Sequence, residues 1–342
     1  MLFAFSFIGT FYIMPRSIIK LREKGYVAKD MYKPVRQLIP TNSGIIIVFI
    51  SYLSIAILPL IMRLLNQIFD INSDYSNFTD LHLAFLLVIS IYSLYGLVDD
   101  LLDVGRKAKL FFPIIFGYPL IIVLSPEIIT IPLIGDFDLT KEFSGDVTWS
   151  DVFRVTVIPI YVMVVSNLVN MHSGYNGLQS GLSIIVLSTL LCKSWTDGTI
   201  SNVIPSGAFL GSMLALWWFN KYPSRVFEGN IGSLLFGSVI GCVIVIQEYW
   251  WFGFFILIPH TINFVQWCAW LVLIKKHPEK YLMNDGQHRK FGKVRSDNTI
   301  QVPNRLTLKW LPNYYWRLTE KQSTNANLIF TAVFCVTGLV IF

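Results

Sequence analysis

The sequence is poor in charge. Only 14% of its 342 residues are Asp, Glu, Lys or Arg, whereas an ordinary soluble domain carries about 25%. Hydrophobic residues make up 54% of the chain, which leaves too few polar residues to cover a soluble surface of this size. The composition therefore excludes an ordinary soluble domain and predicts an integral membrane protein.

Glycine, proline and cysteine are also scarce. The 22 Gly and 15 Pro residues are too few for a fibrous or disordered chain. The four cysteines, at positions 192, 242, 268 and 335, lie in apolar runs without CxxC spacing. We therefore expect the cysteines to be buried and to act as small hydrophobic residues. We do not expect them to form disulfides or a zinc site. In a membrane protein the net charge of +6 reflects loop orientation and does not indicate nucleic-acid binding.

Long apolar runs dominate the chain. They lie at about 1–15, 44–65, 81–98, 110–124, 152–169, 181–192, 203–219, 231–247, 250–274 and 326–342. A membrane-spanning helix needs about 20 residues, so the short runs must place flanking polar residues at the interface. We predict an all-α polytopic protein with about ten transmembrane helices and a single membrane domain over residues 1–342. The β-branched stretch IITIPLI at 128–134 predicts a short hairpin.

The distribution of basic residues gives the orientation. Alternating loops at 16–43, 99–109, 170–180, 220–230 and 275–325 hold 7, 3, 0, 2 and 11 of the 27 Lys and Arg residues. Because cytoplasmic loops are enriched in Lys and Arg, these five loops are expected in the cytoplasm and both termini outside.

The first polar cluster follows the third apolar run directly. It reads GLVDDLLDVGRKAK over residues 96–109 and places Asp99 and Asp100 before three basic residues. A solvated loop is the alternative interpretation, but acidic residues contribute little to topology. Carboxylates mixed with Lys and Arg suit a Mg²⁺–diphosphate substrate, because oxygen atoms hold the metal and cations neutralise the remaining phosphate charge.

Two more polar clusters adjoin apolar runs. SNLVNMHSGYNGL at 166–178 offers amide ligands and a tight turn, although interhelical amide hydrogen bonds would also explain it. YPSRVFEGNIGS at 222–233 has glycines that allow close backbone approach and a following helix N-terminus that favours an anion.

The fourth cluster is the basic loop at 275–325, which contains His288 and Arg289. A basic cytoplasmic loop is commonly a topology or lipid-surface feature. However, all four clusters are expected on one side of the membrane, together with Lys33 and the turn at 39–41. We therefore predict an active site at the cytoplasmic face.

At these positions the chain resembles the polyprenyl-phosphate N-acetylhexosamine-1-phosphate transferases (glycosyltransferase family 4 type). The closest branch is that of the UDP-N-acetylglucosamine–dolichyl-phosphate N-acetylglucosaminephosphotransferases and their archaeal relatives. GLVDDLLDVGRKAKLFFP resembles the paired-aspartate segment of the family, and SNLVNMHSGYNGLQSG resembles its T-N-x-x-N-x-x-x-G-x-N-G-L-E-x-G loop. YPSRVFEGNIGSL resembles its F-x-G-D segment, and His288-Arg289 its His-Arg pair. The resemblance implies ten transmembrane helices, an outside N-terminus and a cytoplasmic site.

The resemblance further implies transfer of N-acetylglucosamine 1-phosphate from UDP-N-acetylglucosamine to a dolichyl-type polyprenyl phosphate, with release of UMP. This is the first step of lipid-linked glycan assembly for protein glycosylation, and it implies Mg²⁺, or Mn²⁺, as cofactor. The catalytic positions carried over are Asp99, Asp100 and Lys109, and the metal-binding positions are Asn170 and Asn230. The substrate-binding positions are Lys33, Asn176, Gly177, Leu178, Phe227, His288 and Arg289.

By the resemblance, different substrate-binding residues would contact different parts of the two substrates. Phe227 and the backbone of residues 176–178 would hold the uridine, and His288 and Arg289 would contact the diphosphate and the sugar. Lys33 would lie near a phosphate. The lipid tail is expected in a groove between spans that opens to the bilayer.

The sequence departs from the family pattern at two positions. The aspartate of F-x-G-D, a magnesium ligand in the family, is Asn230, and the glutamate after N-G-L is Gln179. An amide oxygen can ligate Mg²⁺ but removes one negative charge. Either Glu228 or Asp100 compensates, or the metal binds more weakly, or the activity is altered.

A transporter or flippase of a nucleotide or lipid-linked sugar is the alternative from another class. It predicts internal repeats with broken helices in matching halves, and the sequence has none that we detect. Within the family, another UDP-sugar donor or an undecaprenyl acceptor is the alternative, although the three-histidine signature of the peptidoglycan-pentapeptide branch is absent. A homodimer is left open. The expected location is an archaeal-type cell membrane, or the endoplasmic reticulum membrane in a eukaryote.

Overall fold

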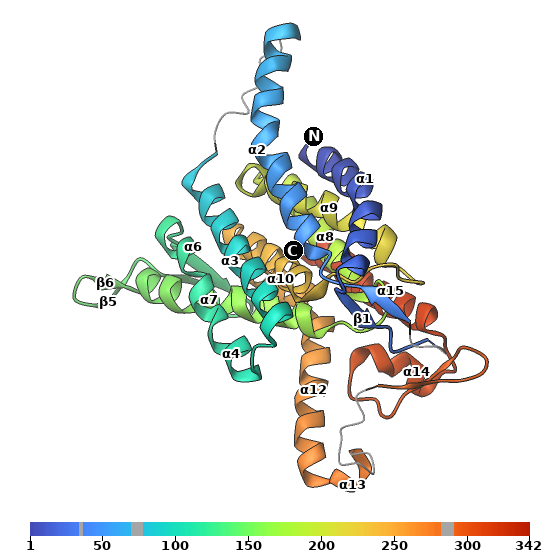
Figure 1. The fold of residues 1–342 in the computed structure, drawn as a ribbon. Helices are drawn as coiled ribbons and strands as arrows, with labels where there is room; N and C mark the ends of the chain where they lie inside the picture. Colours follow the sequence, from blue (N-terminus) through green and yellow to red (C-terminus); the bar gives the residue numbers. More distant parts are fainter. Residues whose placement is uncertain (34–36, 70–77, 282–290) are drawn as a thin grey trace.

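The computed structural model describes residues 1–33, 37–69, 78–281 and 291–342, and these residues are mostly helical (Figure 1). Within them, seven helices are long and apolar enough to cross a membrane, or up to eight if one bent pair forms a single span. The seven are α1 (Leu2–Glu23), α2 (Gly44–Phe69), α3 (Asp80–Leu102), α7 (Trp149–Met171), α8 (Leu178–Thr196), α10 (Gly229–Ile246) and α15 (Glu320–Ile341). The polytopic architecture predicted from the sequence is thus confirmed.

Two apolar runs form shorter helices than a span requires. Run 110–124 is divided into α4 (Arg106–Phe111), α5 (Pro113–Phe116) and α6 (Tyr118–Val123). Proline lies in the first turn of α5 and of α6, where its missing N–H is tolerated, so the run restarts at each one. Run 203–219 forms the 15-residue helix α9 (Ser206–Asn220) after the short 3-10 helix η1 (Ile200–Val203).

The run at 250–274 is bent. It consists of α11 (Trp250–Ile256) and α12 (Ile258–Lys276), which meet at 64°. Pro259 lies in the first turn of α12, so the hydrogen-bond ladder of α11 cannot continue through it. The run predicted as one span is therefore two helices joined at a bend. Figure 1 shows α12 leaving the bundle downwards and ending beside α13 (Pro278–Tyr281).

Helix α10 forms the centre of the bundle, with 89% of its most apolar 18-residue window buried. A Cβ atom on Gly237 would lie 2.5 Å from the Cα of Ser166 in α7, and one on Gly241 would lie 3.1 Å from the Cα of Val162. Glycines four residues apart therefore let α10 and α7 pack backbone to backbone, as small residues do between membrane helices.

Four short hairpins complete the fold. The expected hairpin at 128–134 is confirmed, because β3 (Ile128–Ile131) pairs with β4 (Gly135–Asp138). The pair β5 (Glu142–Ser144) and β6 (Val147–Thr148) follows it, at the left of Figure 1. The other two pairs are β1 (Val27–Lys29) with β2 (Leu38–Pro40), and β7 (Lys293–Val294) with β8 (Ile300–Gln301).

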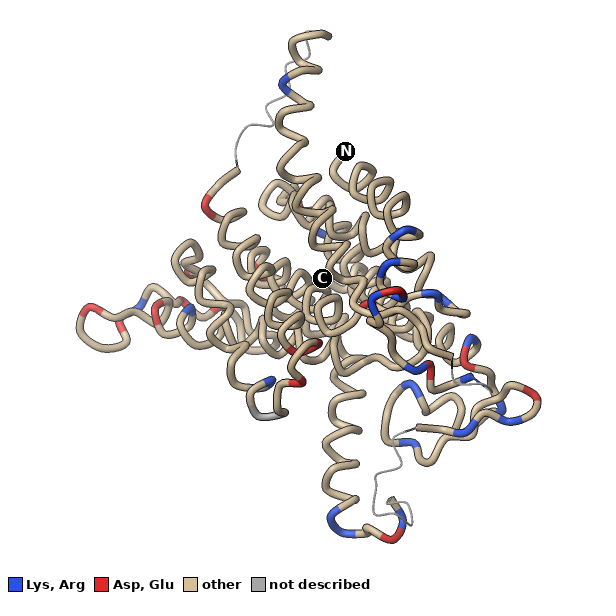
Figure 2. The backbone as a smooth tube through the Cα atoms, in the orientation of Figure 1, with Lys and Arg blue, Asp and Glu red and all other residues tan. Residues whose placement is uncertain are grey.

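The polar segment after α12 packs on the body, as its length predicts. It contains η2 (Leu308–Trp310) and α14 (Leu311–Tyr315). Trp310 and Ile300 join Tyr32, Tyr175, Leu178 and Leu182 in a second hydrophobic core. Most Lys and Arg residues gather at the lower right in Figure 2, around this segment and the end of α1.

Two details differ from the sequence predictions. The loop expected at 99–109 is largely helical, since α3 continues to Leu102 and α4 begins at Arg106. Cys242 and Cys335 are buried as expected, but Cys268 is half-buried and Cys192 is exposed. An apolar residue of a membrane helix can face lipid, so burial inside the protein is not required there.

Candidate active site

An open pocket of about 360 Å³ lies where the β1–β2 hairpin, the α7–α8 loop and the start of α10 meet. Four residues expected in the site line it: Asp100, Asn176, Phe227 and Asn230. Asp30, Gln179, Asn220 and Glu228 add further polar groups to the lining. Phe291, from the basic loop at 275–325, also lines the pocket, so the structure brings together residues of all four polar clusters that the sequence predicts.

Backbone contacts fix this meeting point. The amide of Phe227 donates to the carbonyl of Pro40 at 2.8 Å, and the amide of Gly44 donates to the carbonyl of Glu228 at 2.9 Å. A Cβ on Gly44 would lie 2.3 Å from the amide nitrogen of Gly232, so only glycine fits at the crossing of α2 and α10. The segment before α10 is thereby held against the turn after β2.

Asp100 caps the N-terminus of α10. Its Oδ1 accepts from the amide of Asn230 at 2.9 Å, and its Oδ2 accepts from the amide of Ile231 at 3.0 Å. The side chain of Asn230 donates to the same carboxylate. A carboxylate at this end of a helix satisfies free N–H groups and is favoured by the helix dipole. Asp100 thus joins α3 to α10 inside the pocket.

Asp99 lies outside the pocket lining, and its carboxylate faces Lys109 instead. Its Oδ1 lies 2.8 Å from Lys109 Nζ and accepts from the amide of Val104 at 2.9 Å. The Asp99 carboxylate is almost fully buried, whereas the Lys109 side chain is 33% exposed. The adjacent aspartates therefore have different roles. Asp100 orders the start of α10, and Asp99 holds the Lys109 side chain, which is still accessible to solvent.

Two glycines allow the tight bends of the α7–α8 loop. Gly174 and Gly177 have φ values of +111° and +70°, and a Cβ on Gly177 would lie 2.8 Å from the Cα of Lys221. Leu178 is fully buried in the second core. Asn176 is therefore the pocket-lining member of the expected Asn-Gly-Leu motif, and the other two residues shape and anchor the loop.

Glu228 supplies a second carboxyl group to the pocket. Its Oε2 accepts from Asn220 Nδ2 at 2.9 Å, and Asn220 in turn accepts from the hydroxyl of Ser180 at 2.6 Å. Burial raises the pKa of the Glu228 carboxyl to about 7, although the Asn220 hydrogen bond opposes the rise. Glu228 is thus partly protonated near neutral pH.

The pocket residues fit a hard cation through oxygen atoms. Mg²⁺ takes carboxylate, amide and water oxygens, and Asp100, Glu228 and Asn230 offer the first two kinds. Since the Asn230 side chain donates to Asp100, its amide oxygen remains for a metal. Among the described residues there is no group of three or more His, Cys, Asp or Glu side chains that could hold a metal alone. The lining therefore suits a metal shared with a substrate.

Other expected site residues lie outside this lining. Asn170 is half-buried in the last turn of α7 and does not line the pocket. Lys33 lies beside the pocket, where its ammonium contacts Asp30, Asn176 and Glu320. His288 and Arg289 lie outside the described residues.

Three functional candidates escaped the sequence analysis: Asp30, Lys309 and Glu320. Lys309 is half-buried and donates to the carbonyl of Ser173, in the α7–α8 loop, at 2.8 Å. Burial lowers its pKa to about 8, against the opposing charge of Glu320. The sequence signals Glu320 only as an acidic residue six positions before the last apolar run, at 326–342.

An apolar groove of about 290 Å³ opens on the α7 side of the bent pair α11–α12. Met163, Val164 and Leu168 line it from α7, and Phe254 and Phe264 from α11 and α12. Leu257, at the bend between α11 and α12, also lines it, so the groove lies where the bent pair faces α7. Its apolar lining suits a hydrocarbon chain.

Comparison with known proteins connects these features. Residues 82–248, from α3 to just past α10, match the family model described as glycosyl transferase family 4. A Saccharolobus solfataricus protein provisionally named UDP-N-acetylglucosamine–dolichyl-phosphate N-acetylglucosaminephosphotransferase is 28% identical over 268 residues, which cover 77% of this chain and 74% of that protein.

Two further relatives extend the comparison. The Saccharomyces cerevisiae UDP-N-acetylglucosamine–dolichyl-phosphate N-acetylglucosaminephosphotransferase is 26% identical over 344 residues, covering 90% of this chain and 72% of that protein. The phospho-N-acetylmuramoyl-pentapeptide-transferase of Blochmanniella floridana is 31% identical over 200 residues, covering 52% of this chain and 54% of that protein. The matched family segment contains Asp99, Asp100, Asn176 and Asn230.

Proposed function

Because the chain carries a glycosyl transferase family 4 domain, we propose that it transfers N-acetylglucosamine 1-phosphate from UDP-N-acetylglucosamine to a polyprenyl phosphate of the dolichyl type. The products are polyprenyl-diphosphate N-acetylglucosamine and UMP. The observation that carries the proposal is the pocket itself, because it joins Asp100, Asn176 and Asn230 within the matched segment. The relatives reported above are all named as transferases, which favours this activity over a transporter or flippase.

The two substrates suit the two depressions. The pocket offers carboxyl and amide groups together with the ring of Phe227 for a nucleotide sugar, and the groove along α7 offers apolar side chains for an isoprenoid. The second pKa of a phosphate monoester is about 6, so the acceptor is already mostly a dianion at neutral pH. Positioning and charge neutralisation therefore matter more than proton removal, as in phosphoryl transfer generally.

The chain's own residues have separate parts in this scheme. Asp100, Asn230 and Glu228 would hold Mg²⁺, which when bound would neutralise diphosphate charge. Asp99 keeps Lys109 oriented through its 2.8 Å ion pair, and the accessible ammonium supplies positive charge for a phosphate. His288 and Arg289 complete the proposed diphosphate and sugar contacts.

The membrane arrangement is part of the proposal. We propose ten crossings, both termini outside and a cytoplasmic pocket. The described residues supply seven to eight helices long enough to span a membrane, and the basic loops support the orientation. The expected location is an archaeal-type cell membrane, or the endoplasmic reticulum membrane in a eukaryotic host.

Release of UMP tests the function. Purified protein should release UMP from UDP-N-acetylglucosamine only when a polyprenyl phosphate and Mg²⁺ or Mn²⁺ are both present. A panel of UDP-sugars and of dolichyl and undecaprenyl phosphates would identify the preferred pair. No UMP from any pair, by protein that is folded, would refute the transferase; full turnover in excess chelator would refute the metal.

A further inference from the structure

The strongest unexplained feature beside the pocket is a buried ionic cluster that reaches the last helix. We propose that Glu320, acting with Lys33 and Asp30, positions Asn176 for the nucleotide, so that α15 is a working part of the donor site. This inference rests on the proposed function for the identity of the ligand. It rests on geometry alone for the positioning.

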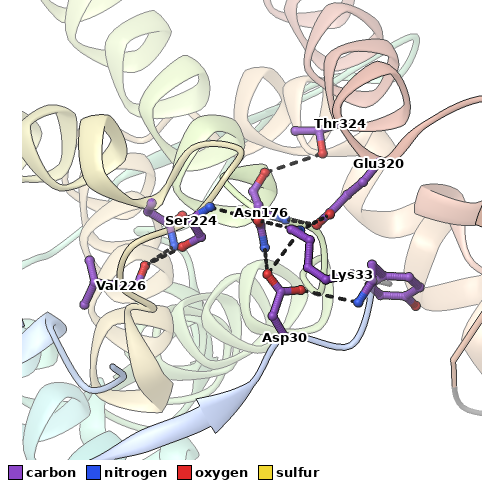
Figure 3. Close-up of polar contacts among 9 residues, drawn as sticks. Asp30, Lys33, Asn176, Ser224, Val226, Glu320 and Thr324 are labelled. Atoms are coloured by element: carbon purple, nitrogen blue, oxygen red, sulfur yellow. Dashed lines mark hydrogen bonds and ion pairs between the residues drawn. The ribbon is translucent and has the colours of Figure 1, made fainter. Parts of the chain in front are cut away.

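The ammonium of Lys33 contacts three acceptor groups. Its Nζ lies 2.5 Å from Glu320 Oε2, 2.9 Å from Asn176 Oδ1 and 3.1 Å from Asp30 Oδ2 (Figure 3). The contacts with Glu320 and Asn176 are hydrogen bonds, and the contact with Asp30 is an ion pair. The side chains of Lys33, Asp30 and Glu320 are 13%, 3% and 2% exposed. Lys33 is thus a buried bridge between two carboxylates and an amide, which is a different role from contact with a phosphate.

This arrangement fixes the orientation of the Asn176 amide. Its Oδ1 accepts from Lys33 Nζ and from the backbone amide of Ser224, both at 2.9 Å. Both partners can only donate, so the oxygen must face them and Nδ2 must face the Asp30 carboxylate, at 3.2 Å. Without Lys33, only Ser224 and Asp30 would oppose a 180° rotation of the amide. Asp30 takes one N–H of Nδ2, which leaves the second for an acceptor on a ligand.

Glu320 holds the backbone of the same residue. Its Oε1 accepts from the amide of Asn176 at 2.7 Å while its Oε2 binds Lys33. The hydroxyl of Thr324, one turn further along α15, lies 3.5 Å from the Asn176 carbonyl. Figure 3 shows Asn176 at the centre of these contacts, with Glu320 and Thr324 on one side and Asp30 on the other. One carboxylate therefore ties the α7–α8 loop and the segment after β1 to α15.

The contacts join parts of the chain that are far apart in sequence. Lys33 and Glu320 are 287 residues apart, and Asn176 and Glu320 are 144 apart. Buried charges are costly unless they are paired, and removing one partner leaves the others uncompensated. The cluster of Lys33, Asp30 and Glu320 therefore adds little net stability to the fold. Its place beside the pocket is explained if it orients the Asn176 amide for a ligand.

The test compares Glu320→Gln, Lys33→Met and the double variant by two measurements. The first is UMP release, with separate titrations of donor and acceptor. The second is backbone hydrogen exchange at residues 173–178. Lys20→Met/Glu23→Gln, which removes an exposed ion pair at the end of α1, is the matched control.

We expect both single variants to raise the KM for the UDP-sugar at least tenfold and to speed exchange at 173–178. The acceptor KM should stay within about twofold, and Glu320→Asp should recover part of the loss. The double variant should be milder than the product of the single effects, because it leaves no uncompensated charge from the Lys33–Glu320 pair. The control should match the parent in every measurement.

The outcomes separate this inference from the proposed function. If the parent releases no UMP, the transferase fails, and the exchange at 173–178 still decides whether Glu320 and Lys33 hold the loop. Unchanged donor KM and unchanged exchange in folded single variants would overturn the positioning. If a single variant does not fold, the double variant, which removes both members of the Lys33–Glu320 pair, is measured in its place. Parent-like values there would also overturn it.

Discussion

The pocket and the two hairpins after α6 use the same kinds of polar residue in opposite ways. Three aspartates in and just after the hairpins are bonded nearby: Asp136 to Thr130, Asp138 to Thr140, and Asp151, in the first turn of α7, to Arg154, with partners two to six residues away. Around the pocket, Asp100 bonds to residues 130 and 131 positions away, and Glu320 to residues 144 and 287 positions away.

The acidic side chains of the two regions also differ in how far they are buried. The hairpin aspartates are exposed or half-buried, whereas Asp30, Asp99 and Glu320 are almost fully buried. Exposed local bonds complete turns and caps, and their removal costs little. Buried long-range bonds hold distant segments in one geometry, and their removal leaves charges unpaired. The difference indicates which polar residues serve a ligand and which serve the local fold.

Loss of the paired carboxylates should give the largest effect. Asp99→Asn and Asp100→Asn should each lower the rate of UMP release at least tenfold, which corresponds to about 1.4 kcal/mol of transition-state stabilisation. The reason is that one carboxylate orients Lys109 and the other orders the start of α10. Asp136→Asn, in the hairpin, is the control and should keep the parent's rate. Parent-like rates in both pocket variants would reduce these aspartates to structural residues.

Variants at Asn230 should show whether it binds the metal, both in thermal stability and in the rate of UMP release. Asn230→Asp replaces a hydrogen bond to Asp100 with a second carboxylate facing it. We expect this variant to unfold at lower temperature than the parent without Mg²⁺ and to recover as Mg²⁺ is added, because a ligand that binds the folded state stabilises it. Its Mg²⁺ requirement for activity should fall, and that of Asn230→Ala should rise. Superimposable Mg²⁺ titrations of all three proteins would remove Asn230 from the ligand set.

The apolar groove offers a smaller and more selective effect. Val164→Trp should fill part of the groove lined by α7 and α12 and raise the KM for the polyprenyl phosphate several-fold, with the donor KM unchanged. Leu94→Trp places the same bulk on an outward face of α3 and serves as control, since Leu94 is also exposed. Equal acceptor titrations for the two variants would show that the lipid binds elsewhere.

The smallest effect concerns the pH dependence of stability. Burial places the pKa of Lys309 at about 8, below the usual lysine value of 10.5. Between these values the unfolded chain binds more protons than the folded protein, so the free energy of unfolding should rise with pH. Lys309→Met should lack this rise, which thermal unfolding in detergent would show. Parallel curves for parent and variant would contradict the burial of a neutralisable lysine.

The sequence predicts the helices better than their shapes. Every apolar run contains helix, because hydrophobicity and length determine where a chain enters a membrane. The breaks at Pro113, Pro119 and Pro259 change short runs into helical fragments and a bend. A proline in a membrane helix can be tolerated or can end the helix, depending on neighbours that the sequence alone does not place. Pro15, Pro59 and Pro159 lie inside continuous helices.

The site was predictable where motifs are local. Asp100, Asn176, Phe227 and Asn230 lie in short polar segments, and each lines the pocket. Asp30 and Glu320 gave little signal, because each is a single acidic residue whose partner is more than 140 residues away. The bonding of Lys33 to Glu320 could not be foreseen for the same reason, because the two residues are 287 positions apart. Long-range pairing is a property of the packed helices, and no local pattern encodes it.

We infer that the nucleotide binds where buried polar groups converge. Hydrogen exchange of the purified protein should be measured with and without UDP-N-acetylglucosamine and Mg²⁺. We expect slower exchange at residues 173–178 and 226–231 when the donor is present, with no change in the hairpins at 128–148. Protection in the hairpins instead, or no protection in the two pocket segments at saturating donor, would contradict it.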